Sequence, residues 1–172
     1  MKRFIGAVIA ALLFTTLVYG RTGAELRNVL ETLYPREAPK AYIDVQLRDI
    51  PGNIAYVEYV AHNPEDGIPV YVVGFDRTVA EQESDELISA TLAHEIGHIA
   101  LMHHNYAKEV VELGVYYNPV TEMEADNYAV GLVGYDSYLS AMMWFAARFR
   151  GNTQVRARLR ILRMKHNDVP TP

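Results

Sequence analysis

The sequence predicts an α+β fold in which a small antiparallel sheet is followed by a helical bundle. Between residues 41 and 75, apolar side chains alternate with polar ones or form short β-branched runs, as they do in strands. From residue 84 onward they recur at helical spacing. Because the strands come first and the helices follow, without alternation of the two, the α+β class is favoured over a doubly wound parallel sheet.

One helix and three strands are predicted for the first half. Leucines recur at helical spacing over residues 24–34. Residues 41–47 alternate polar and apolar side chains, and residues 54–60 form a returning strand after the turn Pro51-Gly52-Asn53. The third strand, residues 68–75, is rich in β-branched residues and is expected to be buried.

Four helices are predicted for the second half. Ser84 precedes two acidic residues and is expected to cap a helix that runs to about residue 103. Thr121 is expected to cap a helix over residues 122–130. Two further helices are expected, over residues 138–148 and 153–165.

Length and composition indicate one domain, residues 21–172, with enough hydrophobic residues for a core. The absence of cysteine excludes disulfides, iron–sulfur clusters, thiolate zinc sites and cysteine nucleophiles. Residues 49–147 contain sixteen acids and two bases, whereas residues 148–165 contain seven bases and no acid. This basic segment is expected either to pack across an acidic body or to form a surface for anionic lipid or nucleic acid. The overall acidity argues against a nucleic-acid partner.

The first 20 residues have the pattern of a signal peptide or an N-terminal membrane anchor. Met1-Lys2-Arg3 is a positive start, and the sixteen residues 4–19 are uncharged and largely apolar. They end in small or modest residues before Arg21, as a cleavage site requires, although a short anchor has similar features. Either interpretation places the domain outside the cytoplasm, as a periplasmic or secreted protein or as a membrane-anchored one.

The motif His94-Glu95-Ile96-Gly97-His98 lies on a predicted helix, between the largely apolar segments 88–93 and 99–102. Two histidines four residues apart project from the same helix face, the geometry that binds one zinc ion. Glu95 is rotated toward the open coordination position, where a carboxylate acts as general base and then as general acid. Gly97 is expected to let another segment approach the helix closely.

A catalytic zinc ion needs a third protein ligand, and the sequence offers two candidates. Glu122 and Asp126 share one face of a predicted helix, so Glu122 is expected to bind the metal and Asp126 to accept the ring N–H of a ligand histidine. Glu124 is expected to be exposed. His104 is the alternative, at the spacing of the last metzincin histidine, but Leu101 replaces the glycine at which those chains reverse.

HEIGH followed by EMEAD resembles the HExxH…ExxxD pattern of gluzincins, and more narrowly the HtpX and CaaX prenyl endopeptidase family of zinc metallopeptidases. The resemblance covers residues 68–162. It implies that His94, His98 and Glu122 bind zinc, that Glu95 is the catalytic base and that Asp126 supports a ligand. Residues 152–159 resemble the start of the family's C-terminal helix, which makes Arg156 the match of its arginine, with a role in stabilising the site or binding substrate.

These observations predict a zinc-dependent metalloendopeptidase that binds one Zn²⁺ ion, acts on a protein or peptide substrate and serves in extracytoplasmic protein quality control. The alternative is a zinc-stabilised module that binds client proteins, as a chaperone does, without hydrolysing them. Glu95 distinguishes the two, because zinc binding alone does not need it. An exposed strand edge beside the site, from residues 54–60 or 68–75, is expected to hold an extended peptide.

Overall fold

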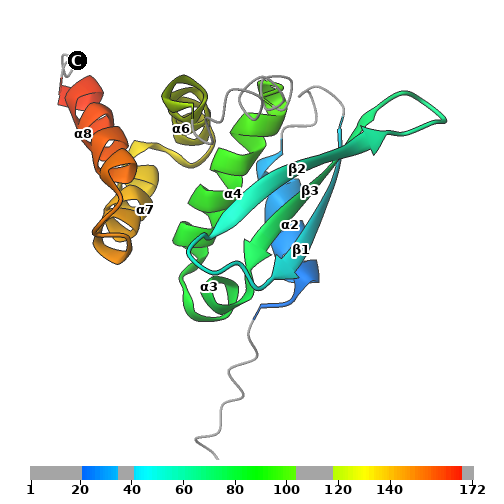
Figure 1. Cartoon of the computed structure of the whole chain (residues 1–172), viewed down its shortest axis with the longest axis horizontal. Helices are drawn as coiled ribbons and strands as arrows, with labels where there is room; N and C mark the ends of the chain where they lie inside the picture. Colours follow the sequence, from blue (N-terminus) through cyan, green and yellow to red (C-terminus); the bar gives the residue numbers. More distant parts are fainter. Residues whose placement is uncertain (1–20, 35–40, 104–117, 168–172) are drawn as a thin grey trace, which may run out of the picture.

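The computed structural model describes residues 21–34, 41–103 and 118–167 (Figure 1). The predicted leader, residues 1–20, and the alternative ligand His104 lie outside the described residues. Within the described part of the chain, no helix combines the length and the hydrophobicity needed to cross a membrane. The fold is α+β, as predicted, with one small sheet and helices packed beside it.

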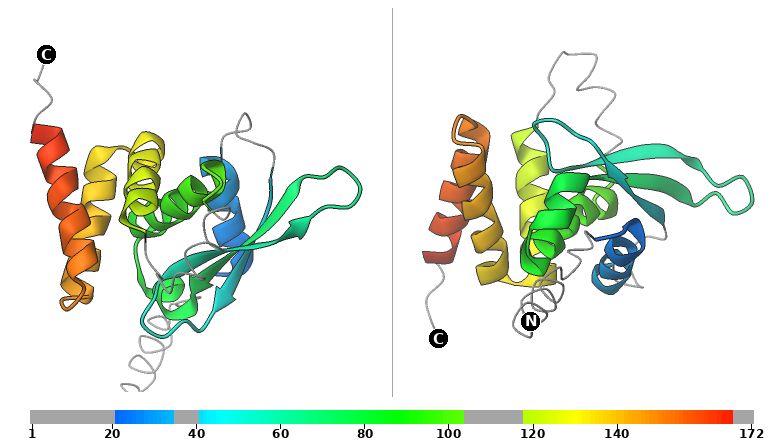
Figure 2. Two further views of the ribbon diagram at one scale, coloured as in Figure 1. Left: turned by 45° about the horizontal axis from the view of Figure 1, so that its top comes forward. Right: turned by 90° about the horizontal axis from the view of Figure 1, so that it is seen from below.

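The first described helix, α2 (Gly23–Leu33), begins at a capping box. The Thr22 side chain accepts a hydrogen bond from the Glu25 N–H, and the Glu25 carboxylate accepts one from the Thr22 N–H. Leu26 and Leu30 are buried, which confirms the helical spacing of the leucines. Together with α4 (Asp85–Ala100), this helix covers one face of the sheet (Figure 2).

The sheet is mixed, so the prediction of an antiparallel sheet is wrong for one of its two strand pairs. Its strands are β1 (Tyr42–Arg48), β2 (Ala55–His62) and β3 (Pro69–Asp76), in the order β1-β3-β2. β2 and β3 pair antiparallel, whereas β1 and β3 pair parallel. β1 and β2 do not pair with each other, because β3 lies between them.

The hydrophobicity of β3 explains its central position. Tyr71, Val73 and Phe75 are at most 1% exposed, whereas the second half of β2 is exposed. The connection from β1 to β2 crosses the end of β3 instead of forming a hairpin. There, Asp76 accepts a hydrogen bond from the Ile50 N–H at 3.2 Å and donates its own N–H to the Ile54 carbonyl at 2.7 Å.

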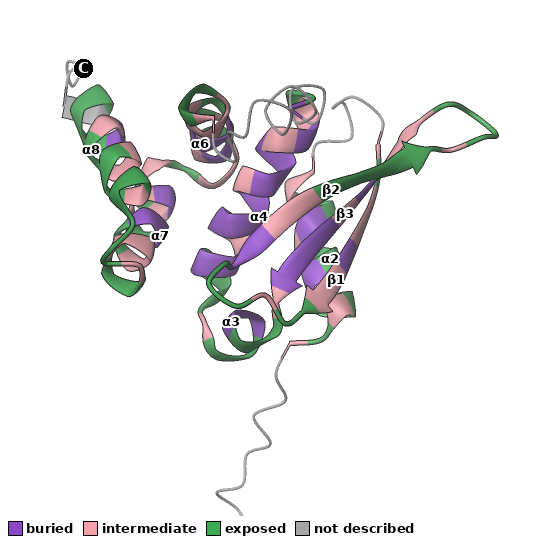
Figure 3. Ribbon diagram, viewed as in Figure 1, coloured by how far each residue is buried: buried purple, intermediate pink, exposed green. Residues whose placement is uncertain are grey.

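The sheet is followed by the short helix α3 (Arg77–Gln82), which the sequence analysis missed, and by α4. The Ser84 hydroxyl accepts a hydrogen bond from the Leu87 N–H at 3.3 Å, which confirms the predicted cap. α4 is buried along most of its length, between the sheet and the C-terminal helices (Figure 3). It ends at Ala100, three residues before the predicted end.

Three helices complete the described fold: α6 (Pro119–Val133), α7 (Tyr135–Arg148) and α8 (Thr153–Asn167). The predicted cap Thr121 is wrong, because Asn118 caps α6 and accepts a hydrogen bond from the Val120 N–H at 3.0 Å. Pro119 occupies the first turn, where its missing N–H removes no hydrogen bond. The earlier start places Glu122 in the first turn of α6.

α4 and α6 cross in close contact at Gly97. A Cβ atom on Gly97 would lie 2.9 Å from the Ala125 Cα and 3.0 Å from its carbonyl oxygen. Real Cβ atoms essentially never approach other atoms this closely, so only glycine permits this helix separation. The close approach expected at Gly97 is therefore present, and α6 is the segment that makes it.

Gly97→Ala is expected to lower the free energy of unfolding by about 1–3 kcal/mol, because the new methyl group pushes α6 away from α4. Urea denaturation measures the change. Gly131→Ala is the matched control, since a Cβ there meets no atom within 4 Å. The control should leave stability unchanged or raise it by up to about 1 kcal/mol through helix propensity. Equal effects of the two variants would contradict the steric explanation.

Candidate metal centre

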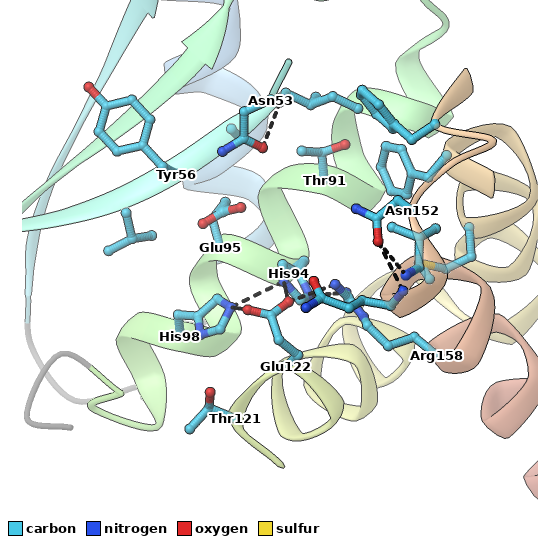
Figure 4. Close-up of a pocket in the computed structure, with 18 of the residues that line it drawn as sticks. Asn53, Tyr56, Thr91, His94, Glu95, His98, Thr121, Glu122, Asn152 and Arg158 are labelled. Atoms are coloured by element: carbon cyan, nitrogen blue, oxygen red, sulfur yellow. Dashed lines mark hydrogen bonds and ion pairs between the residues drawn. The ribbon is translucent and has the colours of Figure 1, made fainter. Parts of the chain in front are cut away.

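Three side chains from α4 and α6 converge at the crossing of these helices. His94 and His98 lie one turn apart on the face of α4 that meets α6, and Glu122 reaches them from the first turn of α6 (Figure 4). The Nε2 atoms of the two histidines are 3.1 Å apart. Glu122 Oε2 lies 3.3 Å from His94 Nε2, and Glu122 Oε1 lies 3.5 Å from His98 Nε2.

These separations fit a tetrahedral metal site. A metal ion with bonds of about 2.0–2.1 Å to nitrogen and oxygen places its ligand atoms roughly 3.3 Å apart. The measured separations, 3.1, 3.3 and 3.5 Å, scatter around that value. His94, His98 and Glu122 are thus a group that could hold a metal ion, and three protein ligands leave the fourth position free.

Asp126 supports His94 from the side opposite the cluster. Its Oδ1 lies 3.1 Å from His94 Nδ1, and the same carboxylate accepts a hydrogen bond from the buried Tyr138 hydroxyl. When a metal ion displaces the proton on Nε2 of His94, the proton on Nδ1 stays shared with Asp126, and the Nε2 lone pair is directed at the space between Glu122 and His98. The position of Asp126 therefore agrees with the sequence prediction.

Arg158 of α8, which the sequence analysis did not single out, lies between Asp126, Glu122 and His94. Its Nε donates to Asp126 Oδ2 at 2.8 Å, and its Nη1 donates to Glu122 Oε2 at 2.6 Å. Its Nη2 pairs with Asp126 Oδ1 and lies 3.3 Å from His94 Nδ1. One guanidinium group thereby compensates both carboxylates of α6.

Arg156, the arginine that the resemblance selects, is exposed and contacts none of the other predicted site residues. Helical periodicity explains the difference. Val155, Leu159 and Leu162 follow the i, i+4, i+7 spacing of the packed face of α8, and Arg158 lies on that face. Arg156 lies on the opposite face. The apolar periodicity of the predicted helix therefore indicates Arg158, not Arg156, as the arginine that faces the site.

The electrostatic environment shifts the pKa values of the two histidines in opposite directions. Burial and Arg158 lower the pKa of His94, but hydrogen bonds to Asp126 and Glu122 outweigh them and raise it to about 9. Burial and the neighbouring His94 lower the pKa of His98 to about 3. For Glu122, burial acts upward, but His94 and Arg158 bring the pKa down to about 2. The cluster thus shares one proton, and a metal cation would displace that proton.

Glu95 has a different environment from Glu122, although it follows His94 directly. Its side chain lies outside the cluster and faces the cavity (Figure 4). It is 8% exposed, and within the described residues its carboxylate has no hydrogen-bond or ion-pair partner. Burial raises its pKa to about 7, which is close to the value that a general base and acid need at neutral pH.

The cluster forms one wall of a cleft with a volume of about 780 Å³. The opposite wall is β2, and the ends of the cleft come from the first turn of α6, the last turns of α7 and the start of α8. β2 pairs with β3 along one edge, whereas β3 is paired along both. Of the two strands that the sequence offered for binding a peptide, only β2 has a free edge within the described residues.

Comparison with protein-family models, with curated proteins and with solved structures found no match for this chain. The chemistry of the site therefore rests on its own geometry.

We expect the protein to bind one divalent metal ion per chain and His98→Ala to weaken that binding. The loss should exceed about 100-fold, because removing only the hydrogen-bond partner of a ligand already costs roughly 10–100-fold. Isothermal titration with Zn²⁺ and Co²⁺ measures the change. His62→Ala, an exposed histidine on β2, is the control and should bind like the wild type. Equal affinity of the two variants would contradict the assignment of His98.

Arg158→Ala is expected to destabilise the fold by about 3–5 kcal/mol, because it leaves two largely buried carboxylates without a countercharge. Arg156→Ala, two residues away and exposed, should change stability by less than about 0.5 kcal/mol. Urea denaturation of both metal-free variants provides the comparison. Similar losses in the two would show that Arg158 does not carry the buried charge.

Proposed function

We propose that the protein is a zinc-dependent metalloendopeptidase. The observation that carries the proposal is the combination of a three-ligand cluster with the tetrahedral spacing and a separate carboxylate, Glu95, directed into the adjoining cleft. A structural metal site has no need for a fourth, buried and unpaired carboxylate. A hydrolytic one requires a base at that position.

The donor set supports zinc as the metal. Two imidazole nitrogens and one carboxylate, with no thiolate, form one of the ligand sets of catalytic zinc. The ligand separations suit tetrahedral coordination better than the octahedral oxygen shell preferred by magnesium. Asp126 holds a ligand ring by its second nitrogen, an arrangement typical of zinc–histidine sites.

Zinc, when bound, supplies a Lewis acid for the scissile carbonyl and lowers the pKa of its water. The protein supplies the proton transfers. With its pKa raised to about 7 by burial, Glu95 accepts a proton from the attacking water and then delivers it to the leaving amine. Glu95 is almost completely buried at the cleft wall, and this desolvation is the cause of the raised pKa.

The free edge of β2 indicates how a substrate is held. Its residues 55–57 line the cleft opposite His94 and Glu95. An extended peptide that pairs with this edge by backbone hydrogen bonds would lie between the strand and the zinc ligands. Main-chain pairing does not depend on side chains, so the substrate class is an extended, unfolded protein segment or a peptide.

The resemblance to the HtpX and CaaX prenyl endopeptidase family points to the same activity. Together with the leader-like residues 1–20, it supports a role in protein quality control outside the cytoplasm, in a secreted, periplasmic or membrane-anchored enzyme. The competing function, a zinc-stabilised client-binding module, gives no role to the unpaired carboxylate of Glu95.

Glu95→Gln tests the proposal, because it removes the base while it preserves size and the metal ligands. We expect casein cleavage to fall by about 100- to 10,000-fold, the contribution of a general base, with zinc content unchanged. Glu86→Gln, an exposed acid in the first turn of the same helix, is the matched control and should retain full activity. A chelator should abolish cleavage by the wild type.

The two functions give different results in this assay. A wild type that binds zinc and unfolded casein but cleaves nothing would support the client-binding module and contradict the peptidase. Full activity of Glu95→Gln would show that another group is the base.

A further inference from the structure

His103 is a buried side chain in contact with the metal cluster, and the proposed chemistry does not use it. It is 8% exposed, and its Nδ1 lies 2.9 Å from Nδ1 of His98. Its other nitrogen, Nε2, lies 3.2 Å from Glu124 Oε2. Sequence analysis predicted an exposed position for Glu124. Glu124 is half exposed, yet it holds this second nitrogen.

The end of α4 places His103 in this position. If the helix continued to residue 103, His103 would project about 140° around the axis from His98, on another face. Instead, Met102 adopts a left-handed conformation with φ 54°, and the His103 N–H donates to the His98 carbonyl at 3.0 Å. This chain reversal returns the His103 ring to the His98 ring. Met102 is the only described non-glycine residue with a positive φ.

The hydrogen-bond directions follow from the position of the cluster. His98 directs Nε2 toward His94 and Glu122, so its lone pair must be on Nε2 when a metal binds there. The proton of His98 is then on Nδ1, which donates to Nδ1 of His103. His103 in turn carries its proton on Nε2, which donates to the Glu124 carboxylate. The three side chains thus form a chain of hydrogen bonds in one direction.

We propose that His103 and Glu124 are positioning residues that hold the ring of His98 in the orientation and tautomer needed for metal binding. The inference rests on the proposed metal site and extends it. Asp126 provides the same support to His94 directly. His98 has no carboxylate next to its Nδ1 among the described residues, and His103 bridges the distance from that ring to Glu124.

The test measures metal release rather than hydrolysis. Zn²⁺-loaded wild type, His103→Ala, His103→Gln and Glu124→Ala are mixed with excess chelator, and the rate of release is followed. His103→Ala should release zinc about 10- to 100-fold faster, as expected when a ligand loses its hydrogen-bond partner. His103→Gln retains an acceptor for the His98 N–H and should restore most of the loss. Glu124→Ala should show a smaller acceleration in the same direction.

The absorption spectrum of the Co²⁺-substituted protein provides a second readout, since it responds to ligand geometry and not to overall stability. It should change in His103→Ala and return toward the wild-type spectrum in His103→Gln. Glu86→Ala, an exposed acid on α4, is the control and should match the wild type in both measurements. Glu124→Ala removes a half-exposed side chain, so it decides the question even if His103→Ala does not fold.

Three results would overturn the inference. A wild-type release rate and Co²⁺ spectrum in Glu124→Ala, and in His103→Ala where that variant folds, would show that the hydrogen-bond chain of His103 and Glu124 does not act on the metal. Equal defects in His103→Ala and His103→Gln would show that the imidazole only fills space. A wild type that binds neither Zn²⁺ nor Co²⁺ would overturn the proposed function as well, which separates that failure from the first two.

Discussion

The close crossing of α4 and α6 is the constraint on which the site depends. The two histidines lie on α4 and the third ligand lies on α6, and the ligand atoms are only 3.1–3.5 Å apart. Glycine at position 97 allows the backbone of α6 to lie against α4 at that distance. α4 also packs between the sheet and the C-terminal helices, so the helix that carries the histidines is in contact with other elements on both sides.

Close packing of these helices creates an electrostatic problem that the last helix solves. Glu122 and Asp126 lie four residues apart on the same buried face, and their mutual repulsion and desolvation would be unfavourable without a cation. Arg158 donates hydrogen bonds to both carboxylates, and Asp126 also accepts one from the Tyr138 hydroxyl. α8 is therefore part of the site. The sequence analysis offered packing of the basic segment against an acidic body as one interpretation, and Arg158 makes such a contact. Arg156, Arg160 and Arg163 are exposed.

The two histidine ligands are supported in unequal ways. His94 contacts the buried carboxylate of Asp126, which pairs with Arg158. Burial and Arg158 lower the pKa of His94, but hydrogen bonds to Asp126 and Glu122 outweigh them and raise it. His98 contacts a neutral imidazole that leads to a carboxylate near solvent. The contact of His94 is thus with a charged group, whereas the contact of His98 mainly orients its ring. The orientation of the His98 ring thus depends on the reversal of the chain after α4, because this reversal brings His103 to His98.

Local interactions made much of the protein predictable from its sequence. Three predicted features depend only on residues within one or two helical turns. They are the spacing of His94 and His98, the common helix face of Glu122 and Asp126, and the cap at Ser84. The α+β class followed from the order of the periodicities. Periodicity along α8 already distinguishes Arg158 from Arg156. Only the tertiary structure decided the parallel pairing of β1 with β3 and the contact of His103 with His98. Each of these depends on which distant segments pack together or on where a helix ends, and side-chain periodicity within one segment does not contain that information.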